Sequence, residues 1–340
     1  MIDGPSDLAV AAARRRLAPA VAPAPGALTS LPARRGARVV VVAGPGVLAA
    51  RARSGLVALV GITGATVVST VGAKGLLRWD DPRHGGTVGL QAGDAQLAEV
   101  ATADLVVTTG LDPRESVGLT TALRARAEAD PASVVDVHPA HLALAAGGWP
   151  PAEQPGPRPP LYDRLAAVVG PLYEAEPAES GAVPPPAAAA ALAAGLPPGG
   201  LVVAPPGPAG FWIGRTFPTT EPGSVMVPIG DPPGTAAAVA LLAARAGRPT
   251  TLVVAEVDQA TAARAGGGAP GVRDDRATVA TVLAAADGEG LSVAVETWRG
   301  AETAEGSGPG TGRFVDWSVL DPLVAVAGPP DDAIWPDGPT

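Results

Sequence analysis

The chain alternates short runs of β-branched and aliphatic residues with longer segments whose apolar residues recur at helical spacing. In its first half, strands are predicted at 37–44, 64–70, 104–110 and 132–137, and helices at 46–61, 94–103 and 116–129. This alternation is typical of parallel strands joined by right-handed helical crossovers, which bury a sheet on both faces. It restricts the fold to the α/β class, with mainly parallel sheets flanked by helices.

A proline-rich segment at 149–160 separates this unit from a second one with the same alternation. There, strands are predicted at 201–206, 224–230, 250–257 and 291–298, and helices at 161–174, within 182–200, at 234–247 and at 275–288. We therefore expect two Rossmann-like domains. Their predicted division is an N-terminal helix and Pro/Ala linker at 1–36, a first domain at 37–148, a linker at 149–186, a second domain at 187–299, and a tail at 300–340 with one helix or short strand.

Composition argues against several classes of protein. The formal net charge is -9 and no basic patch is interleaved with aromatic residues, which argues against a nucleic-acid partner. The absence of cysteine rules out disulfides, thiolate metal sites and cysteine nucleophiles. No apolar run reaches the roughly 18–20 residues that cross a bilayer, and the N-terminal arginines follow the short apolar stretch, unlike those of a signal peptide. We expect a cytoplasmic protein without a membrane partner.

A Gly-Pro-Gly turn follows the first predicted strand and opens the first predicted helix. Gly44, Gly46 and Ala49 form a G-x-G-x-x-A array, in which glycines let a backbone approach a phosphate at a helix N-terminus. A dinucleotide site also needs an acidic residue at the end of the second strand, and that strand ends in VVSTVG. The turn therefore predicts either a nucleotide-binding site or a tight strand-to-helix connection.

The loop at 69–89 contains Lys74, which is the only lysine of the chain and a candidate catalytic amine. Asp80, Asp81 and His84 follow it, but DDPRH is also typical of a solvated turn in which proline fixes the backbone. The glycine spacing of a Walker lysine loop is missing, and there is no G-x-S-x-G elbow. The loop alone therefore predicts no reaction.

Asp136, His138 and His141, in DVHPAHLA, are candidate metal ligands. Zinc would need a third or fourth well-placed donor and a second shell of hydrogen bonds. The same residues also fit the end of a strand and the start of a helix at Pro139. Both interpretations stay open.

The order of these features resembles the central domain of thiamine-diphosphate enzymes of the acetolactate synthase and benzoylformate decarboxylase type. That domain has a strand ending in threonine, a Lys-Gly step, an acidic-Pro-x-His turn, a glycine-rich stretch, and a later strand ending in aspartate. The matching residues are Thr70, Gly72, Lys74, Gly75, Asp81, Pro82, His84, Gly86, Gly89, Asp104, Gly110 and Asp136. The resemblance implies that Lys74 belongs to an architectural loop or lines a flavin-type cavity.

The second unit is similar to the diphosphate-binding domain of the same family, in a degenerate form. The family ends one strand in Gly-Asp-Gly, whose aspartate binds magnesium, and has an asparagine as a later second ligand. At the matching places this chain has Ala255, Glu256 and Val257, and then Glu296, Thr297 and Trp298, and it contains no asparagine. The resemblance places Glu256 and Thr297 at the metal positions and Gly230 among the cofactor-binding residues.

Family members begin with a pyrimidine-binding domain whose glutamate activates the cofactor, and this chain starts where that domain would finish. We therefore weigh three hypotheses. The first is a truncated homologue without self-contained catalysis, which acts as a binding or assembly subunit. The second is the active half of a split thiamine-diphosphate-dependent 2-keto acid decarboxylase or carboligase with a separate pyrimidine-domain subunit. The third is a protein that binds FAD or an ADP-type nucleotide, and a homo-oligomer is expected under each.

Overall fold

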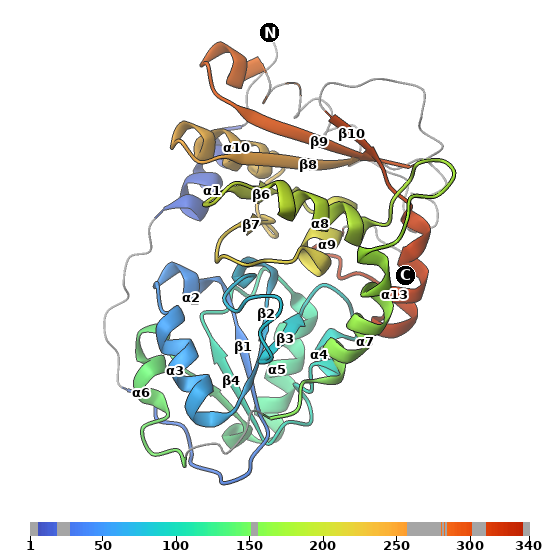
Figure 1. Cartoon of the computed structure of the whole chain (residues 1–340). Coiled ribbons are helices and arrows are strands. Elements are labelled where there is room, and N and C mark those ends of the chain that lie inside the picture. Colours follow the sequence, from blue (N-terminus) through green and yellow to red (C-terminus); the bar gives the residue numbers. More distant parts are fainter. Residues whose placement is uncertain are drawn as a thin grey trace.

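The computed structural model describes residues 6–18, 28–150, 156–256, 280, 282, 284–300 and 311–335. It contains two five-stranded sheets, which lie one above the other in Figure 1 with helices around each. Every pairing between these strands is parallel. The predicted α/β class is confirmed. No helix in the described ranges is both long and apolar enough to span a membrane.

The first sheet has the strand order β3-β2-β1-β4-β5, so the chain reverses direction across the sheet between β3 and β4. Its strands are β1 Val39–Ala43, β2 Thr66–Ser69, β3 His84–Thr87, β4 Leu105–Thr109 and β5 Val134–Asp136. Successive side chains of β1 enter opposite cores: Val40 and Val42 join one apolar cluster, and Val39 and Val41 join another. Burial on both faces explains why these strands are continuous apolar runs.

The first domain departs from its predicted helices at two places. Its helices are α2 Pro45–Ala49, α3 Arg53–Thr63, α4 Asp94–Leu97, α5 Val117–Ala129 and α6 Leu142–Ala145, with short 3-10 turns η1 Val71–Ala73, η2 Pro131–Ser133 and η3 Pro139–His141. The helix predicted at 46–61 is broken because Arg51 has a φ of 52°. The helix predicted at 94–103 ends at Leu97, shortly before Glu99 with a φ of 60°. Both residues lie in the left-handed region, which interrupts an α-helix.

The second sheet has the order β10-β9-β8-β6-β7 and extends past residue 299 into the predicted tail. Its strands are β6 Leu201–Val203, β7 Val225–Met226, β8 Thr250–Glu256, β9 Val293–Arg299 and β10 Thr311–Phe314. Its helices are α8 Pro185–Gly195, α9 Pro208–Thr216, α10 Thr235–Arg245 and α13 Leu320–Ala327, with the 3-10 turn η6 Trp317–Val319. The described residues of the helix predicted at 275–288 are helical. Strand β3 and helix α9 were not predicted, because HGGT and PAGFWIGRT lack a clear apolar period. The tail, predicted to contain one helix or short strand, contains both a strand, β10, and a helix, α13.

Several helices of the described chain connect the two domains. Helix α1, Asp7–Leu17, precedes the first domain but packs on α10 of the second, where Ala9 and Ala13 are buried with the alanines of α10. Helix α7, Pro160–Val169, packs on β3 and on α13, and both helices run along the side of the molecule in Figure 1. One apolar cluster contains residues of both sheets, including Val40 and Val202. The domains therefore share a continuous core.

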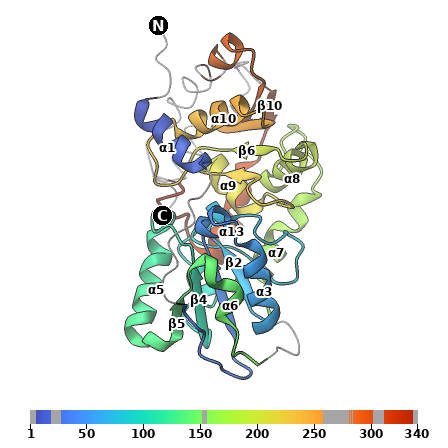
Figure 2. The same cartoon turned by 90° about the vertical axis from the view of Figure 1, so that its left-hand side faces the viewer.

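The carboxyl edge of the first sheet faces the second domain. We call their contact surface the seam: it consists of residues 70–82 and 110–116 from the first domain and 215–222 and 228–231 from the second. The Trp79 amide donates to the Thr219 carbonyl across it at 2.9 Å. Figure 2 shows the same division of the molecule from the side, with α9 above the strands of the first sheet.

Candidate functional site

The Gly44-Pro45-Gly46 turn, predicted as a phosphate cradle, packs against Gly110 at the end of β4. A Cβ atom on Gly44 would lie 2.4 Å from the Gly110 carbonyl oxygen, and one on Gly46 would lie 2.7 Å from the Gly110 Cα atom. The Gly44 amide donates to the Thr109 carbonyl at 2.9 Å, and the Gly46 amide donates to the Gly110 carbonyl at 2.8 Å. The glycines are required by contact between two backbones, and their N–H groups are bonded to protein. The turn therefore fits the tight connection and does not fit a nucleotide phosphate of FAD or ADP.

Open parallel sheets bind ligands at the crevice where the strand order reverses, which is between β1 and β4 in the first sheet and between β6 and β8 in the second. The glycine contact fills the first crevice. At the turn after β6, the Gly207 amide donates to the Ile334 carbonyl at 2.6 Å. The buried Trp335 ring lies 5.7 Å from the Phe211 ring of α9. Residues 331–335 therefore cover the β6–α9 turn.

Lys74 lies in the seam directly after η1, whose Gly72 is close to Pro45 of the glycine turn. Its side chain is 1% exposed, and its Nζ atom lies 4.8 Å from the centre of the Trp79 ring. Burial, assisted by the positive charge of Arg215, lowers the pKa of Lys74 to about 7. The resemblance implied an architectural loop, and a buried lysine packed on an aromatic ring agrees with that interpretation.

The predicted solvated turn holds for only part of DDPRH. Asp80 is exposed and pairs with Arg78, whereas His84 begins β3 and is buried. Burial lowers the pKa of His84 to about 3, so the ring is neutral at physiological pH. Asp81 pairs with Arg83 at 2.8 Å, and that hydrogen bond lowers the pKa of its carboxyl. These residues therefore do not form a shared metal site.

Glu115, which the sequence did not single out, is the most perturbed carboxyl group at the seam. It follows β4, is 2% exposed, and its Oε1 atom lies 3.7 Å from Nη1 of Arg16 on α1. Burial raises the pKa of Glu115 to about 7, against the opposing effects of Thr70 and Arg16. In the sequence, Glu115 lies in the polar segment DPRES, which is typical of a surface loop. Only its position just after a central strand indicates that it lies at the carboxyl edge of the sheet.

Gly230, predicted to bind a cofactor, instead contacts the first domain. Its φ is 72°, and a Cβ atom there would lie 2.7 Å from the Cβ atom of Arg114. The adjacent Asp231 accepts from Nε of Arg16 at 2.6 Å and pairs with Arg114 at 3.3 Å. Arg16 also donates to the Ile229 carbonyl at 2.8 Å. This segment of the seam is therefore an ion-pair network between the domains.

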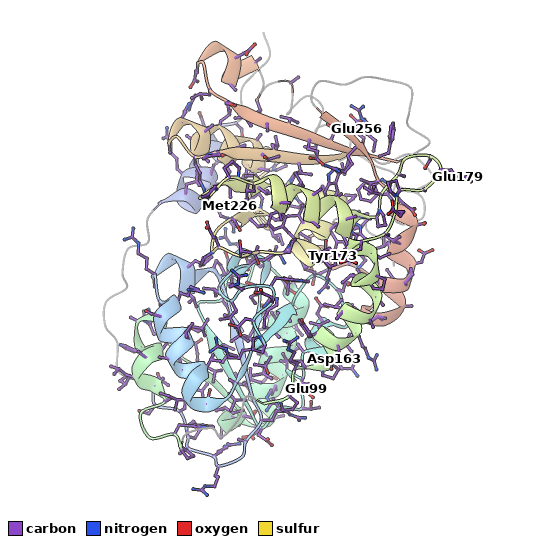
Figure 3. The ribbon with its side chains drawn as sticks, in the orientation of Figure 1. Glu99, Asp163, Tyr173, Glu179, Met226 and Glu256 are labelled. Carbon is purple, nitrogen blue, oxygen red and sulfur yellow. The ribbon has the colours of Figure 1, made fainter. Side chains whose placement is uncertain are left out.

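Glu256 and Thr297, predicted as metal ligands, lie on one face of the second sheet. In the register of β8 and β9, Val254 is opposite Thr297 and Glu256 is opposite Arg299. Because side chains alternate along a strand, Glu256, Thr297 and Arg299 share that face. Nε of Arg299 lies 3.1 Å from Oε2 of Glu256. Figure 3 shows Glu256 at the far end of β8, near the upper right of the molecule.

The described donors at this edge do not fit magnesium and a diphosphate. Magnesium requires near-octahedral oxygen coordination, and the two predicted ligands offer one carboxylate and one hydroxyl. The carboxylate already pairs with the Arg299 guanidinium. Among the described residues, no group of three or more acidic or histidine side chains could hold a metal ion. Val257 lies outside the described residues.

A pocket of about 190 Å³ lies on the other face of the second sheet, between α8 and the first residues of β8 and β9. Its lining includes Leu192, Thr251, Glu296 and Arg313. Glu296 accepts from Nε1 of Trp298 at 2.9 Å and pairs with Arg313 at 2.6 Å. The charged groups that line the pocket therefore have partners within the protein. The pocket itself lies away from the carboxyl edge of the sheet.

The Asp136, His138 and His141 cluster is explained by local structure. Thr108 donates to Asp136 at 2.7 Å across β4 and β5. The Nδ1 atom of His138 accepts from the Ala140 amide at 3.2 Å and caps η3. The two imidazole rings lie 5.5 Å apart in a T-shaped arrangement. The geometry therefore fits the strand-end and helix-start interpretation.

Residues 34–147 match the family model for the central domain of thiamine pyrophosphate enzymes. This segment is a thiamine pyrophosphate enzyme central domain. The family resemblance proposed from the Thr70–Asp136 pattern is thereby confirmed for this domain. No curated protein sequence matches the chain.

Two solved structures show that the likeness of fold extends over both domains of the chain. A thiamine diphosphate-dependent 4-hydroxybenzoylformate decarboxylase from Rhodococcus jostii RHA1 has 17% identity and a TM-score of 0.52, over 85% of this chain and 55% of that one. A thiamin diphosphate-dependent enzyme from Mycobacterium smegmatis has 17% identity and a TM-score of 0.52, over 83% of this chain and 54% of that one. The chain therefore spans about half the length of these structures, with which it shares the fold.

Proposed function

We propose that the chain is a thiamine-diphosphate enzyme homologue without self-contained catalysis, which acts as a binding or assembly subunit. The ion pair between Arg299 and Glu256 carries this proposal. The family resemblance assigns the position of Glu256 to the magnesium-binding acid. A guanidinium at that carboxylate supplies the compensating charge that a divalent ion would supply, and it offers only hydrogen-bond donors, which cannot coordinate a metal.

The two covered crevices support the same proposal. Carbonyls of Thr109 and Gly110 accept from the amides of Gly44 and Gly46, and the Ile334 carbonyl accepts from the Gly207 amide. Backbone N–H groups at such turns are the usual ligands of a phosphate. Their engagement with protein favours a scaffold over a cofactor-binding enzyme.

The experiment is thermal unfolding of the full chain with thiamine diphosphate and Mg²⁺, and separately with FAD and with ADP. A ligand that binds the native state raises Tm by mass action. We expect no rise with any of the three. A rise with thiamine diphosphate and Mg²⁺ would favour the active half of a split decarboxylase or carboligase, and a rise with FAD or ADP would favour the nucleotide-binding alternative.

The assembly role has its own measurement. Sedimentation velocity of the purified chain is expected to give a mass of at least two copies, because a binding or assembly subunit built on this scaffold is expected to associate with itself. A strictly monomeric chain over micromolar concentrations would contradict homo-oligomer formation. In that case the assembly role would require a separate pyrimidine-domain subunit, to be tested by co-sedimentation with one.

A further inference from the structure

The pocket between α8 and the second sheet is open to solvent because small residues form its rim. Ala191 and Gly195 of α8 and Ala294 of β9 line it and are exposed. Leu192 and Leu196 form its apolar wall. Its volume of about 190 Å³ is that of roughly six water molecules in the liquid. The pocket therefore admits a small molecule but is too small for a drug-sized one.

The register of three strands brings the polar groups of the pocket together. Thr251 of β8 is opposite Ala294 of β9, and Thr311 of β10 is opposite Glu296 of β9. Because alternate residues of a strand share a face, Thr251, Glu296 and Arg313 lie on one face of the sheet. All three also line the pocket. The pocket therefore combines a hydroxyl, a carboxylate and a guanidinium with an apolar wall.

Glu296 and Arg313 are bonded to each other, yet each keeps free hydrogen-bonding capacity. Nε1 of Trp298 and Nε of Arg313 both donate to Oε1 of Glu296, at 2.9 and 2.6 Å. Neither bond uses Oε2 of Glu296 or the two Nη groups of Arg313. Within the described part of the chain, neither side chain forms a further hydrogen bond or ion pair. The pair therefore offers an acceptor and a set of donors to a ligand.

The neutrality of this ion pair determines the class of ligand. A ligand that carries only a negative charge is repelled by Glu296, and one that carries only a positive charge is repelled by Arg313. A zwitterion avoids both repulsions, because its ammonium group can bond the carboxylate while its own carboxylate bonds the guanidinium. Hydrogen bonds between charged groups are the strong ones, and a guanidinium matches a carboxylate in geometry.

We propose that this pocket binds the zwitterion of a free α-amino acid with a short aliphatic side chain. The ammonium group of the ligand donates to Oε2 of Glu296 and to the Thr251 hydroxyl. Its carboxylate accepts from the Nη groups of Arg313, and its side chain contacts the leucines of the apolar wall. The pocket lies on the face of the sheet opposite Glu256, so the site does not depend on the proposed assembly function.

The first test is thermal unfolding of the full chain with L-leucine and with two analogues that each lack one charged group. The analogues are 4-methylpentanoate, without the ammonium, and 3-methylbutylamine, without the carboxylate. We expect L-leucine to raise Tm by about 2 °C, with half of the effect at a concentration on the order of 1 mM. Each analogue should require a concentration at least about tenfold higher. No saturable rise with L-leucine, or an equal response to either analogue, would overturn the proposal.

Two variants of α8 locate the binding. Ala191 and Ala194 are both exposed on this helix, and Ala191 lines the pocket whereas Ala194 does not. Leucine is a good helix former, so A191L and A194L should both fold. The larger side chain in A191L occupies part of the pocket and leaves the Glu296–Arg313 pair in place. We expect A194L to respond to L-leucine like the wild type and A191L to lose the response. An unchanged response in A191L would overturn the proposal, because the ligand would then bind elsewhere.

The last measurement does not depend on any variant folding. Free L-selenomethionine has the same two charged groups and an apolar side chain that contains an anomalous scatterer. Crystals of the wild-type chain soaked in it should show a selenium peak in the pocket, beside Leu192 and Leu196. Absence of that peak would overturn the proposal. The result is independent of whether thiamine diphosphate binds, so it separates this site from the proposed assembly function.

Discussion

The two sheets of this molecule have the same parallel α/β construction, yet their carboxyl edges are closed in different ways. In the first sheet, Gly44 and Gly46 press directly on Gly110, so the closure is made of backbone. In the second, Glu256 pairs with Arg299, so the closure at that strand pair is made of side chains. A backbone contact cannot be opened by trimming a side chain, whereas an ion pair can. The second edge is therefore the place where a single substitution could restore access.

The largest expected effect concerns the attachment between the two sheets. Arg215 reaches from α9 into the first domain, where it binds Asp94 at 2.8 Å and the Thr87 carbonyl at 2.7 Å. The variant R215M leaves the Asp94 carboxylate buried without its partner, and we expect a loss of about 3–5 kcal/mol in denaturant unfolding. If the first domain then unfolds separately, two transitions will replace one.

R245M is the control for that variant. Arg245 pairs with Glu289 at the surface of the second domain, and solvent screens such a pair strongly. Its stability should stay close to that of the wild type. Equal losses in R245M and R215M would contradict the role assigned to the buried pair.

The backbone closure of the first sheet is tested by G44A. The added methyl group would meet the Gly110 carbonyl oxygen at 2.4 Å and the Leu111 Cα atom at 2.5 Å, and both are backbone atoms. We expect a loss of about 3 kcal/mol, at the upper end for overpacking. In G61A, where α3 leaves open space around the glycine, alanine should be neutral or stabilise the helix by up to about 1 kcal/mol. If G44A is as stable as the wild type, the contact between Gly44 and Gly110 does not close the first edge, and the difference between the two edges is contradicted.

A smaller, pH-dependent effect is expected at Glu115 in the seam. Burial raises its folded-state pKa to about 7 from 4.5, so the folded state holds a proton that the unfolded state has lost. Stability from this group is present below pH 4.5 and is lost as the pH rises through about 7. E115Q should therefore match the wild type near pH 4.5 and exceed its unfolding free energy by about 3 kcal/mol above pH 8. The measurement is urea unfolding of both proteins across that pH range. A difference in unfolding free energy that does not change with pH would show that Glu115 is ionised in the folded state throughout, which would contradict this prediction.

The smallest expected effect is that of R299M. Arg299 and Glu256 are each about one-tenth exposed, and loss of the guanidinium should lower Tm by a few degrees. The same variant removes the Arg299 guanidinium from the Glu256 carboxylate. Weak Mg²⁺ binding by R299M but not by the wild type, measured by calorimetry, would sharpen the contrast between a side-chain closure and a backbone closure. If neither protein binds Mg²⁺, the absence of the family's other metal ligands is enough by itself to prevent binding, and the ion pair is not needed to explain it.

Much of the fold was predictable because its strands are buried on both faces. Apolar runs such as VVVVA in β1 and TTLVVAE in β8 predict strands without any knowledge of their neighbours. The missed strand β3 has the sequence HGGT, whose pairing depends on the neighbouring strand β2. Local propensity cannot report such a tertiary effect.

The candidate site was less predictable, for a related reason. The Gly44-Pro45-Gly46 turn was correctly associated with close backbone approach, but the approaching group is Gly110, sixty-odd residues away, and not a phosphate. Glu115 was missed because the groups that surround it, Gly72 after β2 and Arg16 of α1, are distant from it in the sequence. The relation between Glu256 and Arg299 requires the register of β8 and β9, which spacing alone does not supply.

We propose that the Glu256–Arg299 pair closes the second edge to the family's metal and cofactor. The most direct test of this proposal is a calorimetric titration of thiamine diphosphate, with Mg²⁺ in excess, into the wild-type chain. We expect no saturable heat. A saturable isotherm with one thiamine diphosphate per chain, abolished by E256Q, would contradict it.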